Sequence, residues 1–342
     1  MTSPVSRRTA LAAGMGAALA AGGIRPAARA ARLPAAQIIP PGPGELAMGI
    51  FEPGAPGDPK VLDRIAEQIG RMPAFVQWYE AWGSDISRFS ERLRIERLQA
   101  VAERGAIPYI TWEPWIPELG PEQPEYAPAR IAAGEYDAYL RTWALPLAAW
   151  GGPVYLRMFH ELNAEWYPWG AVHPWNTPED LVAAWRHVCQ VFRDAGAWNV
   201  RWVWCVDAAL GKVALSRIYP GDDVVDWVGI DGYNWGLEHP ESGWRSFDEI
   251  FSVAYRSLVR LTARPVMIAE TASVERGGDK AAWIANAFAA LPRRYSRVRA
   301  IAWFNEERPD GDFPVSSSPE SLDAFRAAIS GPAMWAPLEY AP

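Results

Sequence analysis

Two glutamates in this 342-residue sequence lie just after short apolar segments. Glu161 follows residues 154–159, and Glu270 follows residues 266–269. If these segments are the fourth and seventh strands of one eight-stranded barrel, the two carboxyl groups can approach each other across its mouth. A protonated carboxyl group and an ionised one, about 5–5.5 Å apart, can cleave a glycosidic bond with retention of configuration. The alternative is that one glutamate is only an ion-pair partner, for instance of Arg157.

Other polar and aromatic residues follow the ends of further apolar segments, where a barrel places its functional face. The chain has 19 tryptophans, a residue whose flat ring can cover a bound sugar. The candidates for contact with a ligand are Trp112, Glu113, His160, Asn163, Trp166, Tyr233 and Trp303. Each could instead be a core or structural residue, but their recurrence at one end of the segments favours a binding face.

Eight apolar segments of strand length alternate with helical periodicity from residue 48 onwards, which predicts an α/β fold. The segments are 48–51, 74–78, 107–112, 154–159, 200–205, 225–230, 266–269 and 300–304. Eight units in about 280 residues favour a closed (β/α)8 TIM barrel as a single domain over residues 48–335. An open doubly wound sheet is the competitor, but Pro53 and Pro56 stand where its phosphate loop would need backbone donors.

The N-terminal residues predict an export signal over residues 1–30. Arg7 and Arg8 precede a short Ala/Gly/Leu-rich segment, and residues 28–30 form an A-x-A cleavage site. The paired arginines resemble a twin-arginine signal, although Ala10 stands where Phe is usual, so general secretion is the alternative. The apolar segment is too short for a membrane anchor. Residues 31–47 are rich in Pro, Ala and Gly and predict a linker. We therefore expect an exported protein, periplasmic or extracellular.

The composition limits the classes of molecule that this protein is expected to bind. A net charge of −7 without a run of Lys or Arg argues against nucleic acid and against an anionic membrane surface. Cys189 and Cys205 do not make a disulfide framework and are expected to be buried thiols, with a single bridge as the alternative. The histidines lack metal-ligand spacing, so we expect no metal and no cofactor. We expect a monomer whose partner is a β-linked polysaccharide or oligosaccharide.

Residues 157–166, Arg-Met-Phe-His-Glu-Leu-Asn-Ala-Glu-Trp, closely resemble the R-x-x-H-E-x-N-G-x-W signature of glycoside hydrolase family 26. Ala164 replaces the Gly of that signature. Residues 268–271 resemble the nucleophile segment of the family, and residues 231–235 resemble its tyrosine motif. The family comprises β-mannanases, lichenases and β-1,3-xylanases on a (β/α)8 barrel.

The resemblance implies a role for each matched residue. Glu161 would be the general acid/base and Glu270 the nucleophile. His160 would hydrogen-bond beside the cleaved bond, Tyr233 would donate to Glu270, and Trp303 would stack on the sugar in the −1 subsite. Asn163 and Trp166 would shape the wall around Glu161.

The substrate stays open at this point. An endo-β-1,4-mannanase is the first expectation, but Trp112 and Glu113 depart from the mannanases of the family. A lichenase or an exopolysaccharide hydrolase is the alternative within the enzyme class. A non-catalytic glycan-binding barrel is the alternative outside it.

Overall fold

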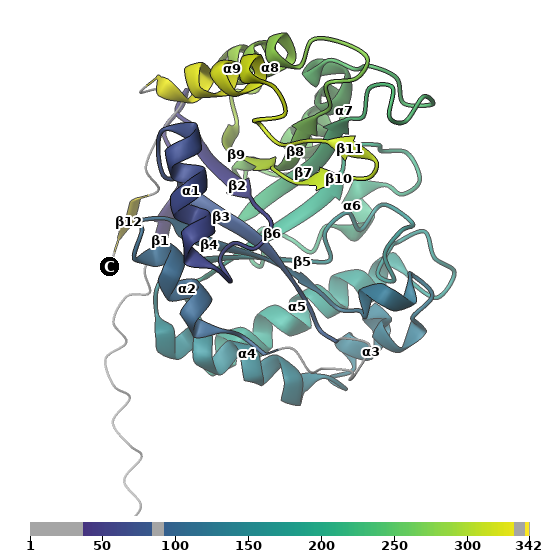
Figure 1. The fold of residues 1–342 in the computed structure, drawn as a ribbon. Coiled ribbons are helices and arrows are strands. Elements are labelled where there is room, and N and C mark those ends of the chain that lie inside the picture. The colour runs from purple at the N-terminus through teal and green to yellow at the C-terminus, as the bar shows by residue number, and fades with distance from the viewer. Residues whose placement is uncertain (1–36, 84–91, 332–338, 342) are drawn as a thin grey trace, which may run out of the picture. The chain divides into compact units, whose positions relative to one another are not determined.

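The computed structural model describes residues 37–83, 92–331 and 339–341. In these ranges eight parallel strands form a closed barrel with helices around its outside (Figure 1). Each strand pairs with the next along the chain, and the last returns to pair with the first. The barrel strands are β2 (Ala47–Phe51), β3 (Phe75–Ala81), β4 (Ile107–Glu113), β5 (Val154–Met158), β6 (Val200–Asp207), β7 (Trp227–Asn234), β8 (Val266–Ser273) and β9 (Val298–Phe304). The predicted (β/α)8 fold is confirmed.

The helices begin where local sequence signals place them. In α5 (Pro178–Ala195) the Thr177 hydroxyl accepts a hydrogen bond from the Asp180 amide at 3.1 Å. Ser246 and Glu249 form a capping box at the start of α7 (Phe247–Leu261). The other α-helices in the described ranges are α1 (Pro59–Ile69), α2 (Ile95–Ala102), α3 (Pro128–Ala132), α4 (Asp137–Trp150), α6 (Leu215–Ile218), α8 (Lys280–Arg294) and α9 (Pro319–Ser330), and two short 3-10 helices, η1 (Pro117–Leu119) and η2 (Pro124–Tyr126), precede α3.

Two short antiparallel pairs add to the barrel. Strand β1 (Gln37–Ile39) pairs with β12 (Glu339–Ala341), and β10 (Glu307–Arg308) pairs with β11 (Gly311–Asp312). The segment 31–47, predicted as a linker, thus contributes β1 and the first residue of β2. The predicted export signal lies outside the described residues. Within the described ranges, no helix has the length and apolar character needed to cross a membrane.

Side chains of the barrel strands alternate between the barrel interior and the layer beneath the helices. On β4, Tyr109 belongs to the interior cluster, whereas Ile110 and Trp112 belong to the cluster packed under the helices. On β9, Ala300 and Ala302 face inward, whereas Ile301 and Trp303 face the helices. The alternation decides which residue at each strand end can reach the mouth.

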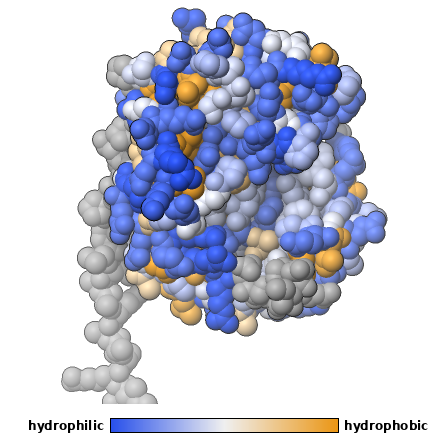
Figure 2. Space-filling model, viewed as in Figure 1, coloured by the Kyte–Doolittle hydropathy of each residue, from blue (hydrophilic) through white to orange (hydrophobic). Residues whose placement is uncertain are grey.

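Most tryptophans serve this packing rather than a binding face. Eleven of the 19 are buried, and eight of these are among the largest fully buried side chains: Trp82, Trp112, Trp143, Trp169, Trp185, Trp204, Trp227 and Trp303. The face seen in Figure 2 is largely hydrophilic, with scattered hydrophobic residues. The high tryptophan count is therefore mainly a feature of the core.

Trp112, predicted as a ligand contact, is one of these core residues. It is fully buried, and its ring lies 4.9 Å from that of Trp82, 5.0 Å from Trp143 on α4 and 5.7 Å from Phe192 on α5. The prediction is wrong because Trp112 points outward from β4, while its neighbour Glu113 faces the mouth of the barrel.

Replacing Trp112 with Ala is expected to lower the free energy of unfolding by about 3–5 kcal/mol, because a large cavity opens between β4 and its helices. Urea unfolding followed by circular dichroism measures this change. Trp166→Ala is the matched control: that side chain is 46% exposed, so its removal should change stability by less than about 1 kcal/mol. Equal losses in the two variants would contradict this placement of Trp112.

Candidate active site

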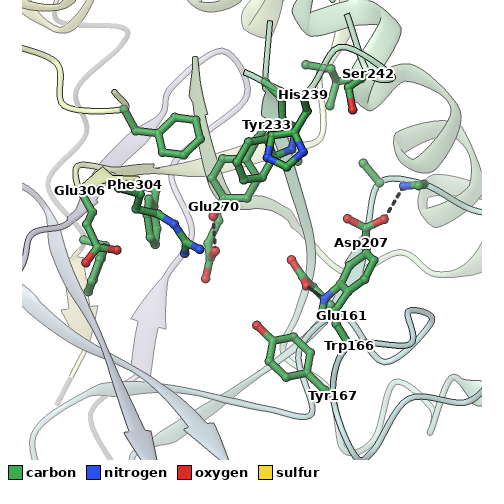
Figure 3. Close-up of a pocket in the computed structure, with 18 of the residues that line it drawn as sticks. Glu161, Trp166, Tyr167, Asp207, Tyr233, His239, Ser242, Glu270, Phe304 and Glu306 are labelled. Carbon is green, nitrogen blue, oxygen red and sulfur yellow. Dashed lines mark hydrogen bonds between the residues drawn. The ribbon is translucent and has the colours of Figure 1, made fainter. Parts of the chain in front are cut away.

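A cavity of about 780 Å³ lies at the carboxyl ends of the barrel strands and contains both predicted catalytic glutamates. Figure 3 shows Glu270 with Phe304 and Glu306 on one side of it, and Glu161 with Trp166 and Asp207 on the other. Glu113, Tyr167 and Tyr233 also line it. Acidic and aromatic side chains therefore face one common cleft.

Glu270 reaches this space because of an irregularity in β8. Ile268 pairs with Ile230 of β7, but the next pair along is Glu270 with Asp231, so β8 holds one extra residue. The register against β9 shifts at the same place. Met267 and Ala269 point into the barrel, so strict alternation would turn Glu270 outward. The bulge turns Glu270 inward instead.

Four side chains hydrogen-bond the Glu270 carboxylate. Gln77 donates from Nε2 to Oε1 at 2.8 Å, and Tyr79 and Arg157 also donate to Oε1. Tyr233 donates to Oε2. Burial alone would raise the pKa of Glu270, but the charge of Arg157 and the two phenol donors lower it to about 2. Glu270 is thus held ionised.

Arg157 is the fully buried cation beneath the cavity. Its Nη1 lies 2.9 Å and 2.7 Å from the two carboxylate oxygens of Asp231, and its Nη2 reaches Glu270. The Thr111 hydroxyl accepts from Nη2 at 2.7 Å. The arrangement pairs one cation with two buried acids and directs its planar group at both.

Glu161 stands in a contrasting environment. It has a left-handed backbone conformation, with φ of 52°, as does Phe159 with φ of 51°. Such values are uncommon outside glycine and are found where a site holds a side chain in place. Trp166 donates its indole N–H to Glu161. Burial, followed by the charges of Asp231, Asp207 and Glu270, raises the pKa of Glu161 well above its usual value.

The two glutamates are close enough to act on one bond. One carboxylate oxygen each from Glu161, Asp231 and Glu270 lie within 4.8 Å of one another. Three acids at this spacing could also ligate a metal ion. Arg157 already pairs with two of them, so the cluster has a cation of its own. The geometry therefore points to acid–base and nucleophilic chemistry at these two glutamates.

Comparison with known proteins gives the family. Residues 138–301 match the family model described as glycosyl hydrolase family 26. Endoglucanase H of Acetivibrio thermocellus is 39% identical over 274 residues, which cover 78% of this chain and 29% of that protein. The barrel belongs to glycosyl hydrolase family 26.

Two further relatives of this family 26 barrel are mannan-degrading enzymes by name. Mannan endo-1,4-beta-mannosidase A and B of Caldalkalibacillus mannanilyticus is 28% identical over 166 residues, or 46% of this chain and 29% of that protein. A modular endo-beta-1,4-mannanase from Cellulomonas fimi has the same fold, with a TM-score of 0.64 and 19% identity over 85% of this chain and 72% of that one. The chain spans less than a third of the length of either curated relative.

Two predicted ligand contacts of the family 26 barrel lie behind the cavity wall instead of on it. His160 is buried, with its ring 4.4 Å from that of Tyr167 and its Nε2 3.9 Å from Glu113. Asn163 donates to the Asp207 carbonyl at 3.0 Å and accepts from the Asp207 amide at 2.8 Å. Neither is among the described residues that line the cavity. Both hold residues that do line it.

Trp303, predicted to stack on a bound sugar, is not among the described residues that line the cavity. It is buried under α8 and α9, with its ring 6.2 Å from Trp283 and 5.4 Å from Phe325. Its indole N–H donates to the Phe313 carbonyl at 3.0 Å. Strand alternation turns Trp303 outward and Phe304 into the cavity. The prediction of a stacking platform at Trp303 is therefore wrong for this structure, and Phe304 occupies the cavity side.

Several residues of the site were not predicted: Gln77, Tyr79, Asp207, Asp231, Phe304, Arg308 and Phe313. A signal for three of them was available. Gln77 and Tyr79 alternate with Trp78 on β3, and Asp207 is the last residue of the apolar strand β6. The alternation on β3 predicts that Gln77 and Tyr79 point into the barrel, and the position of Asp207 predicts that it lies near the mouth. Their contacts with residues of other strands cannot be predicted in this way.

Replacing Arg157 with Met is expected to lower the free energy of unfolding by about 3–5 kcal/mol at pH 7, because Asp231 and Glu270 are left buried without a cation. The pKa of Glu270 in the fold is about 2, below its unfolded value. Its stabilising effect is therefore present above pH 4.5 and lost as the pH falls through 4.5 towards 2. The difference between wild type and variant should shrink over that interval, as measured by urea unfolding at pH 7 and pH 3.5.

Arg130→Met is the control for this measurement. Arg130 pairs with Glu135 at the surface, where the two side chains are 47% and 43% exposed. That variant should change stability by less than about 1 kcal/mol at either pH. A loss in Arg157→Met no larger than in Arg130→Met would refute the central role of the buried cation.

Proposed function

We propose that the chain is a retaining β-glycoside hydrolase in which Glu270 is the nucleophile and Glu161 the general acid/base. One observation carries this proposal. Two glutamates face each other in one cavity with oxygens within 4.8 Å, and their surroundings shift their pKa values in opposite directions. This separation of protonation states is what the double-displacement route requires.

In the first step the Glu270 carboxylate attacks the anomeric carbon, and the bond from that carbon to the leaving oxygen breaks. Glu161 gives its proton to the leaving oxygen. A covalent glycosyl–enzyme ester forms, and Glu161 becomes ionised. Arg157, Tyr79 and Tyr233 hold Glu270 in place for the attack.

In the second step Glu161 removes a proton from water, whose oxygen attacks the anomeric carbon from the face that the leaving group vacated. The ester bond breaks, and Glu270 is again a carboxylate. Trp166 donates to Glu161 throughout and so steadies the ionised form made in the first step. Two inversions restore the original configuration.

The cleft has room for a run of sugars, which supports endo action. A second cavity of about 350 Å³ adjoins the first and shares Phe51, Tyr79 and Glu306 with it. It lies on the side of Glu270, because Tyr79 hydrogen-bonds Glu270 and lines both cavities. Sugars preceding the cleaved bond would extend in this direction, and Glu161 would face the leaving group.

The substrate we propose first is a β-linked glucan, because endoglucanase H matches 78% of the chain at 39% identity. A β-1,4-mannan is the second candidate, supported by the 28% identical mannosidase. We also propose export, supported by Arg7, Arg8 and the A-x-A site at residues 28–30.

Replacing either glutamate with Ala should lower kcat on polysaccharide at least about 10³-fold. Glu161→Ala should retain the first step on an aryl glycoside with a good leaving group, which needs little protonation, whereas Glu270→Ala should not. Proton NMR of the wild-type reaction should show the β-anomer first. An initial α-anomer, or full polysaccharide turnover by Glu161→Ala, would disprove the mechanism.

A substrate panel distinguishes the candidates. Barley mixed-linkage glucan, lichenan, cellulose, galactomannan, glucomannan and β-1,3-xylan are each incubated with wild type, and the released oligosaccharides are identified. We expect release from a glucan. Release from the mannans alone would support the second candidate. Binding without hydrolysis of any member would favour a glycan-binding barrel.

A further inference from the structure

The loop between β9 and α9 forms one wall of the cavity. Its β10–β11 hairpin and the residues next to it bring Glu306, Arg308 and Phe313 to the lining. The Phe313 ring lies 5.4 Å from that of Tyr233, which donates to Glu270, and 5.1 Å from that of Trp235. The position of this wall therefore bears directly on the site.

A buried lysine holds the wall from behind. Lys280, at the start of α8, is fully buried and lies outside the cavity lining. Its ammonium donates to the carbonyls of Asp312 and Pro314, each at 2.8 Å, and to the Ser317 hydroxyl at 2.7 Å. The two carbonyls flank Phe313, and together with the Ser317 hydroxyl they take up the three donors that an ammonium has.

Glu275 extends the same network. Its Oε1 accepts from the hydroxyls of Ser317 at 2.6 Å, Ser318 at 2.8 Å and Ser321 at 2.8 Å. Its amide donates to the Asp312 side chain at 2.9 Å. The loop after β8, the strand that carries Glu270, is thus tied to the loop after β9.

A lysine at position 280 is unusual for this chain, in which nearly all basic residues are arginines. Only three of its 33 basic residues are lysines, and the other two, Lys60 and Lys212, are exposed. Burying an ammonium is unfavourable unless its hydrogen bonds are specific, and an apolar side chain of similar volume would often stabilise a fold as well or better. The three short hydrogen bonds to one loop supply that specificity.

We propose that Lys280 is a positioning residue for glycan binding, which fixes residues 312–317 so that Arg308 and Phe313 form the cavity wall beside Tyr233. This inference rests on the proposed hydrolase and deepens it. Lys280 touches no substrate. It acts through the wall, so its removal should weaken binding more than it slows bond cleavage.

The test compares Lys280→Met with wild type. Met preserves volume but cannot donate. KM on the polysaccharide that wild type cleaves should rise about 10-fold while kcat falls less than about 3-fold. Hydrogen–deuterium exchange should speed up in peptides covering residues 306–317 and stay unchanged in the barrel strands. Lys60→Met, which alters an exposed lysine, should change neither measurement.

The exchange measurement stands apart from the hydrolase proposal. If wild type cleaves no glycan, the hydrolase proposal fails. Faster exchange confined to residues 306–317 in Lys280→Met would still support the inference that Lys280 fixes this loop. Unchanged exchange in that loop overturns the inference. So does faster exchange with KM unaltered, because Lys280 would then be structural only. If Lys280→Met does not fold, Ser317→Ala removes one acceptor and should show the same changes at smaller size.

Discussion

The buried charge of Arg157 is the interaction on which the rest of the site depends. A guanidinium without solvent needs acids around it, and Asp231 and Glu270 supply them from two neighbouring strands. The cation in turn allows Glu270 to stay ionised in a place where burial alone would protonate it. The Arg157 guanidinium therefore contributes both to the stability of the fold and to the chemistry of the site. A chain that could not bury Arg157 in a closed barrel could not keep a carboxylate ready at that position.

Burial has the opposite effect on Glu161, which has no ion-pair partner among residues 37–83, 92–331 and 339–341. Acids surround it, and among the described residues the Trp166 indole is its side-chain hydrogen-bond donor. Two residues of one type thus acquire different protonation states from their neighbours alone. Both residues are glutamates, so the difference between their pKa values comes from their surroundings. It follows from which strand end each occupies and from which side Arg157 approaches.

Backbone irregularities direct both glutamates. The extra residue in β8 turns Glu270 into the barrel, and left-handed conformations at Phe159 and Glu161 re-aim the chain after β5. The aromatic residues follow the regular alternation instead. Trp112 and Trp303 therefore pack under the helices, while Glu113 and Phe304 face the cavity. A position at the end of a strand therefore does not by itself bring a side chain into the cavity, because alternation turns every second residue outward.

The sequence by itself determined the element order, the closed eight-stranded class of fold and the family signature around Glu161. These features are local or periodic, and apolar spacing with helix caps such as Thr177 records them directly. Only the tertiary structure decided that Gln77 and Tyr79 donate to Glu270, that His160 and Asn163 support the wall, and that Lys280 holds the loop around Phe313. Each of these contacts joins segments distant in the chain, and the bulge that aims Glu270 is defined by pairing with β7 and β9. Such geometry exists only once the barrel has closed, because register between strands is a property of the assembled sheet.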